Sequence, residues 1–359
     1  MRRRRLLAGA GVGLAATLAG CGSLSGVGGR GARGGSLPPY ARSLPADGTT
    51  GLLYLDVGKL VDRGVFDGSD TETATPAQTP TPDEASSDPA SALVAAPVSA
   101  GLLAALLGLG FGLQGYGDAG SRLVAPLYPD RTDVEDEVGL RGLTFVAGVV
   151  VATGAFDTAA FDDALPDGFE TAAEREAYTV STDGDEAAIA VSEEAIVVAT
   201  GTFDDTDGPA TAREAVTRVL DARLGTADRL ADRSPDAEWV LRQAGTHDFV
   251  GGGENTSVDG ADDGDRTYDP LAGTPLAGAQ TSLIVSGASV ELTGGEATNA
   301  RADTALVNTG DAVSQSALES VYADSDATVS VTVSEAADGD DPGQRVHVTG
   351  EFGSAPSRL

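Results

Sequence analysis

The chain has 359 residues, 55 of them acidic and 23 basic, which gives a formal net charge of −32. This balance excludes the broad basic surface that phosphate neutralisation needs, so we expect no nucleic-acid partner. Apolar residues make up 41% of the chain, enough to bury a core in one large domain or two smaller ones. Lys59 is the only lysine, and acidic residues are spread through most of the sequence. Concentrated salt screens repulsion among such charges, so the composition is typical of a protein that works in brine.

The first 20 residues have the pattern of an export signal. Four arginines at positions 2–5 precede an uncharged apolar stretch at 6–18. This stretch is shorter than the about 20 residues that span a bilayer, and its length fits the apolar segment of a signal peptide. Two arginines, one further residue and two leucines match the twin-arginine export pattern. The residues that carry it are Arg3, Arg4, Leu6 and Leu7.

A lipidation motif follows the apolar stretch. Leu18, Ala19 and Gly20 form a lipobox directly before Cys21, which is the only cysteine and therefore forms no intrachain disulfide. We expect cleavage before Cys21 and a lipid on its sulfur, which would hold the exported protein at the outer face of the cell membrane. One acyl chain binds a membrane only marginally, so stable anchoring implies two.

The arginine block, the Leu-Ala-Gly-Cys tetrad, the acid excess and the scarcity of lysine together resemble lipoproteins exported by the twin-arginine route in halophilic archaea. The resemblance covers the first 21 residues and the overall composition. It implies an exported, lipid-anchored protein of uncharacterised function, and it supplies no functional residue besides Cys21.

The mature chain divides into a glycine-rich tether and a folded ectodomain. The predicted divisions are the lipidated cysteine and tether at 21–39, the ectodomain at 40–355, a disordered insertion at 67–90 and a polar loop at 251–270. The insertion is rich in Thr, Pro, Asp and Ser and has almost nothing to bury. The ectodomain is interpreted either as one domain or as two subdomains, at 40–250 and 271–355.

The elements expected along the ectodomain begin with a strand at 51–57. The uncharged segment at 91–117 is interpreted as a buried or partly interfacial helix, because its glycines and Pro97 disfavour a membrane span. The remaining expected elements are a strand at 144–152, a hairpin of 187–191 with 195–199, an amphipathic helix at 209–224, strands at 282–292 and 304–308, a helix at 311–322, and a hairpin of 329–333 with 346–352. This order predicts an α+β fold with largely antiparallel sheet and a few packed helices.

Two weak signals for bound groups lie in loops. Asp205, Asp207 and Glu214 fill some positions of a calcium loop, although Pro209 and an acid-rich helix start explain the same residues without a metal. Asn255 begins an N-glycosylation sequon. We expect no cofactor, with calcium at Asp205, Asp207 and Glu214 as the alternative.

Catalytic motifs are missing from the sequence. No nucleophile elbow or phosphate loop occurs, and both His247 and His347 are expected on the solvated surface, without a zinc site. We therefore expect a non-enzymatic protein that binds or scaffolds an extracellular partner. An envelope-acting hydrolase that uses carboxylates, or a solute-binding lipoprotein, remains an alternative.

Overall fold

The computed structural model describes the chain in segments, and Gly35–Leu359 forms one compact unit. The described residues are 36–47, 51–63, 90–91, 93–95, 97–98, 116, 118–120, 139–184, 187–200, 211–254, 281–293, 296–337 and 343–353. The predicted signal peptide, Cys21, nearly all of the tether and almost all of the insertion at 67–90 lie outside these residues.

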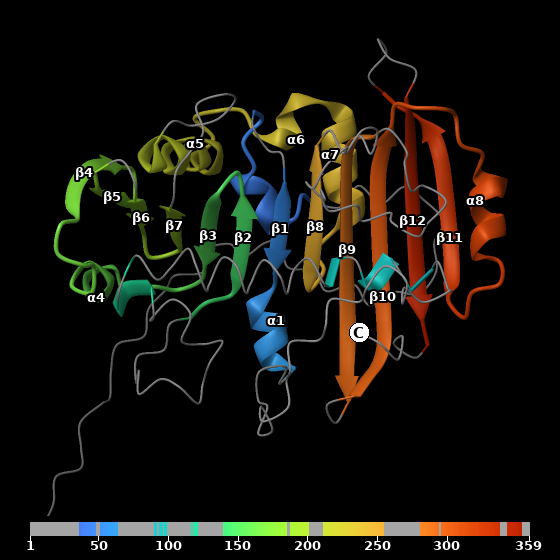
Figure 1. Ribbon diagram of the computed structural model, residues 1–359, viewed down its shortest axis with the longest axis horizontal. Helices are drawn as coiled ribbons and strands as arrows, with labels where there is room; N and C mark the ends of the chain where they lie inside the picture. Colours follow the sequence, from blue (N-terminus) through green and yellow to red (C-terminus); the bar gives the residue numbers. More distant parts are fainter. Residues whose placement is uncertain are drawn as a thin grey trace, which may run out of the picture. The chain divides into compact units, whose positions relative to one another are not determined.

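A single antiparallel sheet of 12 strands runs through the described residues (Figure 1). Its strand order is β11-β12-β10-β9-β8-β1-β2-β3-β7-β6-β5-β4. The strands are β1 (Leu52–Leu55), β2 (Gly142–Val146), β3 (Val149–Thr153), β4 (Glu170–Arg175), β5 (Tyr178–Asp183), β6 (Ala187–Val191), β7 (Ala195–Thr200), β8 (Phe249–Glu254), β9 (Thr281–Thr293), β10 (Glu296–Asn308), β11 (Thr328–Glu335) and β12 (Gln344–Phe352).

Helices pack on both faces of this sheet, which confirms the predicted α+β class. They are the 3₁₀ helix η1 (Pro39–Ser43) and the α-helices α1 (Val57–Asp62), α4 (Thr158–Asp162), α5 (Ala212–Leu224), α6 (Leu230–Arg233), α7 (Pro235–Ala244) and α8 (Gln315–Tyr322).

Each face of the sheet has its own hydrophobic core, because successive strand residues point to opposite sides. In β9, Leu283 and Val285 join the core under α5 and α7. Ile284, between them, joins the core that contains buried residues of α1, α4 and α8. We call the first side the α7 face, since α7 packs against β9 and β10 there.

The hairpin expected at 187–199 and the amphipathic helix are confirmed. β6 and β7 pair from Ala187 to Thr200. The helix α5 begins at Ala212, where the Thr211 hydroxyl accepts a hydrogen bond from the Glu214 amide, and it ends at Gly225 with φ of 74°. The predicted start at Pro209 lies outside the described residues.

The expected strand at 144–152 is two strands. Ala147 and Gly148 have φ values of 48° and 76° and turn the chain between β2 and β3. Two successive residues with positive φ are typical of the tight turns that join antiparallel strands. The apolar run continues through both strands, so hydrophobicity alone did not reveal the turn.

The predicted start of the polar loop at 251–270 is wrong, because it lies inside a strand. Residues 251–254 belong to β8, which lies between β1 and β9. A Cβ on Gly252 would lie 2.2 Å from the Ile284 carbonyl oxygen, so the glycines let neighbouring backbones approach closely. Residues 255–270 lie outside the described part of the chain.

The uncharged segment at 91–117 is described only in part. Residues 90–91, 93–95 and 97–98 are helical, and Leu93, Val94 and Val98 are buried in the core on the side away from α7. Within the described ranges, no helix is both long and apolar enough to cross a membrane.

The C-terminal elements follow the expected order with different bounds. β9 and β10 are each 13 residues long, so the strand predicted at 304–308 begins eight residues earlier, at Glu296. The helix predicted at 311–322 starts at Gln315, because the Ser314 hydroxyl caps it. β11 and β12 form the predicted closing hairpin.

Candidate functional site

The site is built around a carboxylate in the middle of an apolar strand. Asp303 lies between Ala302 and Thr304 in β10, and it is 4% exposed. In the sheet, Gly287 of β9 and Thr349 of β12 stand directly opposite Asp303. A buried charge in this position requires hydrogen-bonding partners to offset its lost hydration.

Four side chains donate hydrogen bonds to the Asp303 carboxylate. The donors are His247 Nε2 at 3.0 Å, His347 Nε2 at 3.1 Å, Thr349 Oγ1 at 2.7 Å and Arg301 Nε at 3.0 Å. Burial alone would raise the pKa of Asp303, but the hydrogen bonds from the two histidines, Arg301 and Thr349 outweigh it and hold that pKa far below its ordinary value. Asp303 is therefore ionised.

His247 reaches the carboxylate from the loop that follows α7. Its ring lies over Gly287, where a Cβ would come within 2.5 Å of the His247 Cδ2 atom. Only glycine leaves room for the imidazole at this position. The ring also orders the loop, because its Nδ1 atom lies 3.0 Å from Ser289 Oγ.

The hydrogen bonds constrain the direction of proton donation through a neutral His247 ring. Ionised Asp303 only accepts, so Nε2 carries the proton, and in the neutral ring Nδ1 is an acceptor. Ser289 Oγ accepts a hydrogen bond from the Asp248 amide at 3.3 Å, and its own proton is free to point to Nδ1. With the ring neutral, the order of donation is from Ser289 to His247 to Asp303.

A second buried carboxylate anchors the same loop. The Asp248 side chain is 0% exposed and forms an ion pair with Arg63, at the end of α1. Its Oδ2 also accepts a hydrogen bond from the Val290 amide at 2.9 Å. Asp248 therefore joins α1 to β9, directly beside Ser289.

Aromatic contacts connect the cluster to α7. The Trp239 and His347 rings pack in a T-shaped arrangement with centroids 6.5 Å apart, and the Arg345 guanidinium lies 5.3 Å from the centre of the Trp239 ring. Arg345 also donates to Asp236 in the first turn of α7, at 2.5 Å. We name Asp303, His247, His347, Ser289, Arg301 and Thr349 the Asp303 cluster.

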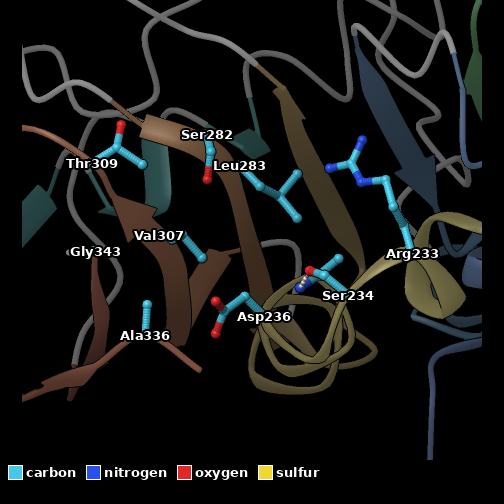
Figure 2. Close-up of a pocket in the computed structure, with 10 residues that line it drawn as sticks. Arg233, Ser234, Asp236, Ser282, Leu283, Val307, Thr309, Ala336 and Gly343 are labelled. Carbon is cyan, nitrogen blue, oxygen red and sulfur yellow. Dashed lines mark hydrogen bonds between the residues drawn. The ribbon is translucent and has the colours of Figure 1, made fainter. Parts of the chain in front are cut away.

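A small hollow of about 240 Å³ lies on the α7 face, at the start of α7 (Figure 2). Asp236 and Ser234 line it from α7, and Leu283 and Val307 line it from the sheet. Its walls are mainly apolar, and Arg233 and Asp236 supply its charged groups.

The predicted site residues lie mostly outside the described ranges. This applies to Arg3, Arg4, Leu6, Leu7, Leu18, Ala19, Gly20 and Cys21, to Asp205 and Asp207, and to Asn255. Glu214 is exposed in the first turn of α5. In the part of the chain that the structure describes, no group of three or more His, Cys, Asp or Glu side chains is arranged to hold a metal.

The expectation that both histidines are solvated is wrong for His247. Its side chain is 9% exposed, and that of His347 is 20% exposed, on the polar side of β12 as predicted. Local sequence patterns did not predict that the two histidines lie close together. Their proximity depends on β8 pairing with β9 and β12 pairing with β10, on either side of the β9–β10 hairpin. One signal was available in the sequence: Asp303 interrupts an apolar strand and must therefore have partners.

Comparison with known proteins leaves the family open. No family model and no curated protein matches the chain. Crystal form I of TP0453 matches with a TM-score of 0.38 and 10% identity, over 89% of this chain and 94% of that one. Crystal form III matches with a TM-score of 0.36 and 9% identity, over 89% and 96%. A likeness this distant carries no argument about function.

Proposed function

We propose that this chain is an exported surface protein that a lipid on Cys21 holds at the outer face of the membrane. The observation that carries the proposal is the position of the only cysteine, directly after Leu18, Ala19 and Gly20 and an apolar stretch preceded by arginines. A thioether at this sulfur attaches the protein without using any residue of the folded unit.

The layout of the chain supports this anchoring. The compact unit is Gly35–Leu359, so residues 22–34 separate it from Cys21. We propose that this glycine-rich segment serves as the tether between the anchor and the folded unit. The strong negative charge keeps such a unit soluble in concentrated salt.

We further propose that the folded unit binds an extracellular partner. The hollow beside Asp236, about 240 Å³, is smaller than the about 300–1,000 Å³ of sites that surround whole small molecules. A hollow of this size fits one projecting group of a larger extracellular partner. Its apolar walls, formed by residues such as Leu283 and Val307, would exclude water from that group.

Mass spectrometry of the protein isolated from its native membrane tests the anchor. We expect a mature chain that starts at Cys21, with the mass of two acyl chains on that residue. A Cys21→Ala variant should lose this mass and the detergent-soluble membrane fraction, whereas the neighbouring Ser23→Ala variant should keep both. A native chain that retains Met1 and an unmodified sulfur would contradict the proposal.

A further inference from the structure

The Asp303 cluster contains a serine, a histidine and an aspartate in a continuous series of hydrogen bonds. Ser289 Oγ lies 3.0 Å from His247 Nδ1, and His247 Nε2 lies 3.0 Å from Asp303 Oδ2. From this geometry we infer that Ser289 is a nucleophile that cleaves carboxylic esters, with His247 as its general base. This activity goes beyond the proposed surface role and does not depend on the anchor.

Ser289 meets the geometric requirements of an activated hydroxyl. The base lies within the about 2.6–3.2 Å over which a proton is transferred directly. Asp303 is a positioning residue, because it fixes the ring through Nε2 and leaves Nδ1 as the acceptor that faces Ser289. It also stabilises the imidazolium that forms when the ring takes the proton.

The Asp303 cluster is buried on the side that faces the protein interior, and it is open to solvent on the other side. Asp303 is 4% exposed and His247 is 7% exposed, whereas Ser289 is intermediate. The side chain of Arg301 is 55% exposed and marks the open side of the cluster. A substrate would therefore approach Ser289 from the side that Arg301 occupies.

Arg301 is placed to stabilise the charge that develops on the substrate. It stands directly opposite Ser289 in the β9–β10 ladder, on the same face of the sheet. Side chains in such a pair have Cβ atoms about 4.5–5.5 Å apart, so the guanidinium can reach an oxygen on the carbon that Ser289 attacks. Arg301 also forms an ion pair with Glu351 at 3.6 Å, which holds it on this side.

This arrangement favours esters over amides. One exposed guanidinium stabilises an oxyanion less than a pair of buried backbone amides does, because water screens the exposed charge. An alcohol leaves a tetrahedral intermediate more readily than an amine and needs less stabilisation. The substrate class is therefore a carboxylic ester.

The two chemical steps, acylation and deacylation of Ser289, require only these residues and water. Ser289 Oγ forms a bond to the carbonyl carbon as His247 Nδ1 takes the hydroxyl proton, and the resulting oxyanion faces Arg301. The carbon–oxygen bond to the alcohol then breaks, the imidazolium returns the proton to that oxygen, and an acyl-serine remains. Water, deprotonated by His247, attacks the acyl group, and the proton returns to Ser289 as the carboxylic acid leaves.

Covalent labelling separates this activity from a purely structural role of the same contacts. The full-length mature protein, in molar salt and detergent, is treated with a fluorophosphonate, and the modified residue is located by peptide mass spectrometry. We expect label on Ser289, and hydrolysis of p-nitrophenyl acetate that the label abolishes. A structural cluster would hold the loop in place but would leave the serine unreactive.

Three variants complete the test. Ser289→Ala should remove the label and the esterase activity while the protein stays folded, and His247→Gln should slow labelling at least about 100-fold. Ser330→Ala removes an exposed serine of β11 on the same face of the sheet and should change neither readout. Folded protein that takes no label, or label found only at another residue, would overturn the inference.

Discussion

Asp303→Asn tests whether the buried carboxylate holds the C-terminal half of the sheet together. In the native protein, four donors share the two Asp303 oxygens. Asparagine keeps one of these oxygens and replaces the other with an NH₂ group, which faces donors instead of accepting from them. The substitution keeps the side-chain volume, so its effect reports on charge and hydrogen bonding.

The expected loss follows from the number of broken contacts. About two hydrogen bonds to a charged group disappear, and each is worth about 1.5–3 kcal/mol. The side chain of Arg301 is 55% exposed, so water replaces part of its contact. We therefore expect the free energy of unfolding at neutral pH to fall by about 3 kcal/mol, at the lower end of the range for removing one partner of a buried ion pair.

The pH dependence gives a second check on the same variant. The folded protein holds the pKa of Asp303 well below its ordinary value. Ionised Asp303 therefore stabilises the fold fully above the unfolded value of about 3.9, and this stabilisation is lost as the pH falls toward the folded pKa. The difference between the native protein and Asp303→Asn should be largest near neutrality and should narrow below pH of about 3.9.

Urea denaturation at constant molar salt, at neutral and acid pH, measures both effects. Asp324→Asn, which changes an exposed carboxylate after α8, is the matched control and should alter stability little. A loss below about 1 kcal/mol for Asp303→Asn at neutral pH would fall within the usual range of minor substitutions and would refute the reasoning. An equal difference at both pH values would refute it as well.

Two further predictions concern packing around β8 and α7. Leu241→Ala should lower the free energy of unfolding by about 2–5 kcal/mol in urea denaturation, because Leu241 is 0% exposed in the core under α7; a loss near zero would mean that α7 does not pack there. Gly252→Ala should lower the free energy of unfolding by at least about 2 kcal/mol, because its Cβ would lie 2.2 Å from the Ile284 carbonyl oxygen. Gly51→Ala is the control, because a Cβ there would meet open space. Equal losses for the two variants would contradict the close approach of β8 and β9.

The sequence predicted elements well where one pattern matched one element. The periodicity of α5 agrees with its buried residues, and the Ser-Glu-Glu turn separates β6 from β7 as expected. Prediction failed where one sequence pattern was compatible with two different structures. The apolar run at 144–152 continues through a turn, and the glycines at 251–253 indicated a loop although they allow close strand packing.

The candidate site was predictable only in part. The alternation of Arg345, His347 and Thr349 with valines places all three on the polar side of one strand, and β12 shows this. Nothing in their spacing connects them to His247 or Asp303, because the connection arises from the order of strands in the sheet. Distances between residues far apart in sequence depend on topology, which local patterns do not encode.

The position of β1 has a consequence for how the molecule assembles. β2 to β7 form one run of neighbouring strands and β8 to β12 another, and β1, only four residues long, lies between the two runs. Its pairing with β8 joins Leu52 to Gly252, two hundred residues later. Each run can gain its strand contacts early from partners nearby in sequence, whereas closing this distant ladder carries a larger entropic barrier. We therefore expect the β1–β8 ladder to form late in folding and to join the two runs of strands into one continuous sheet.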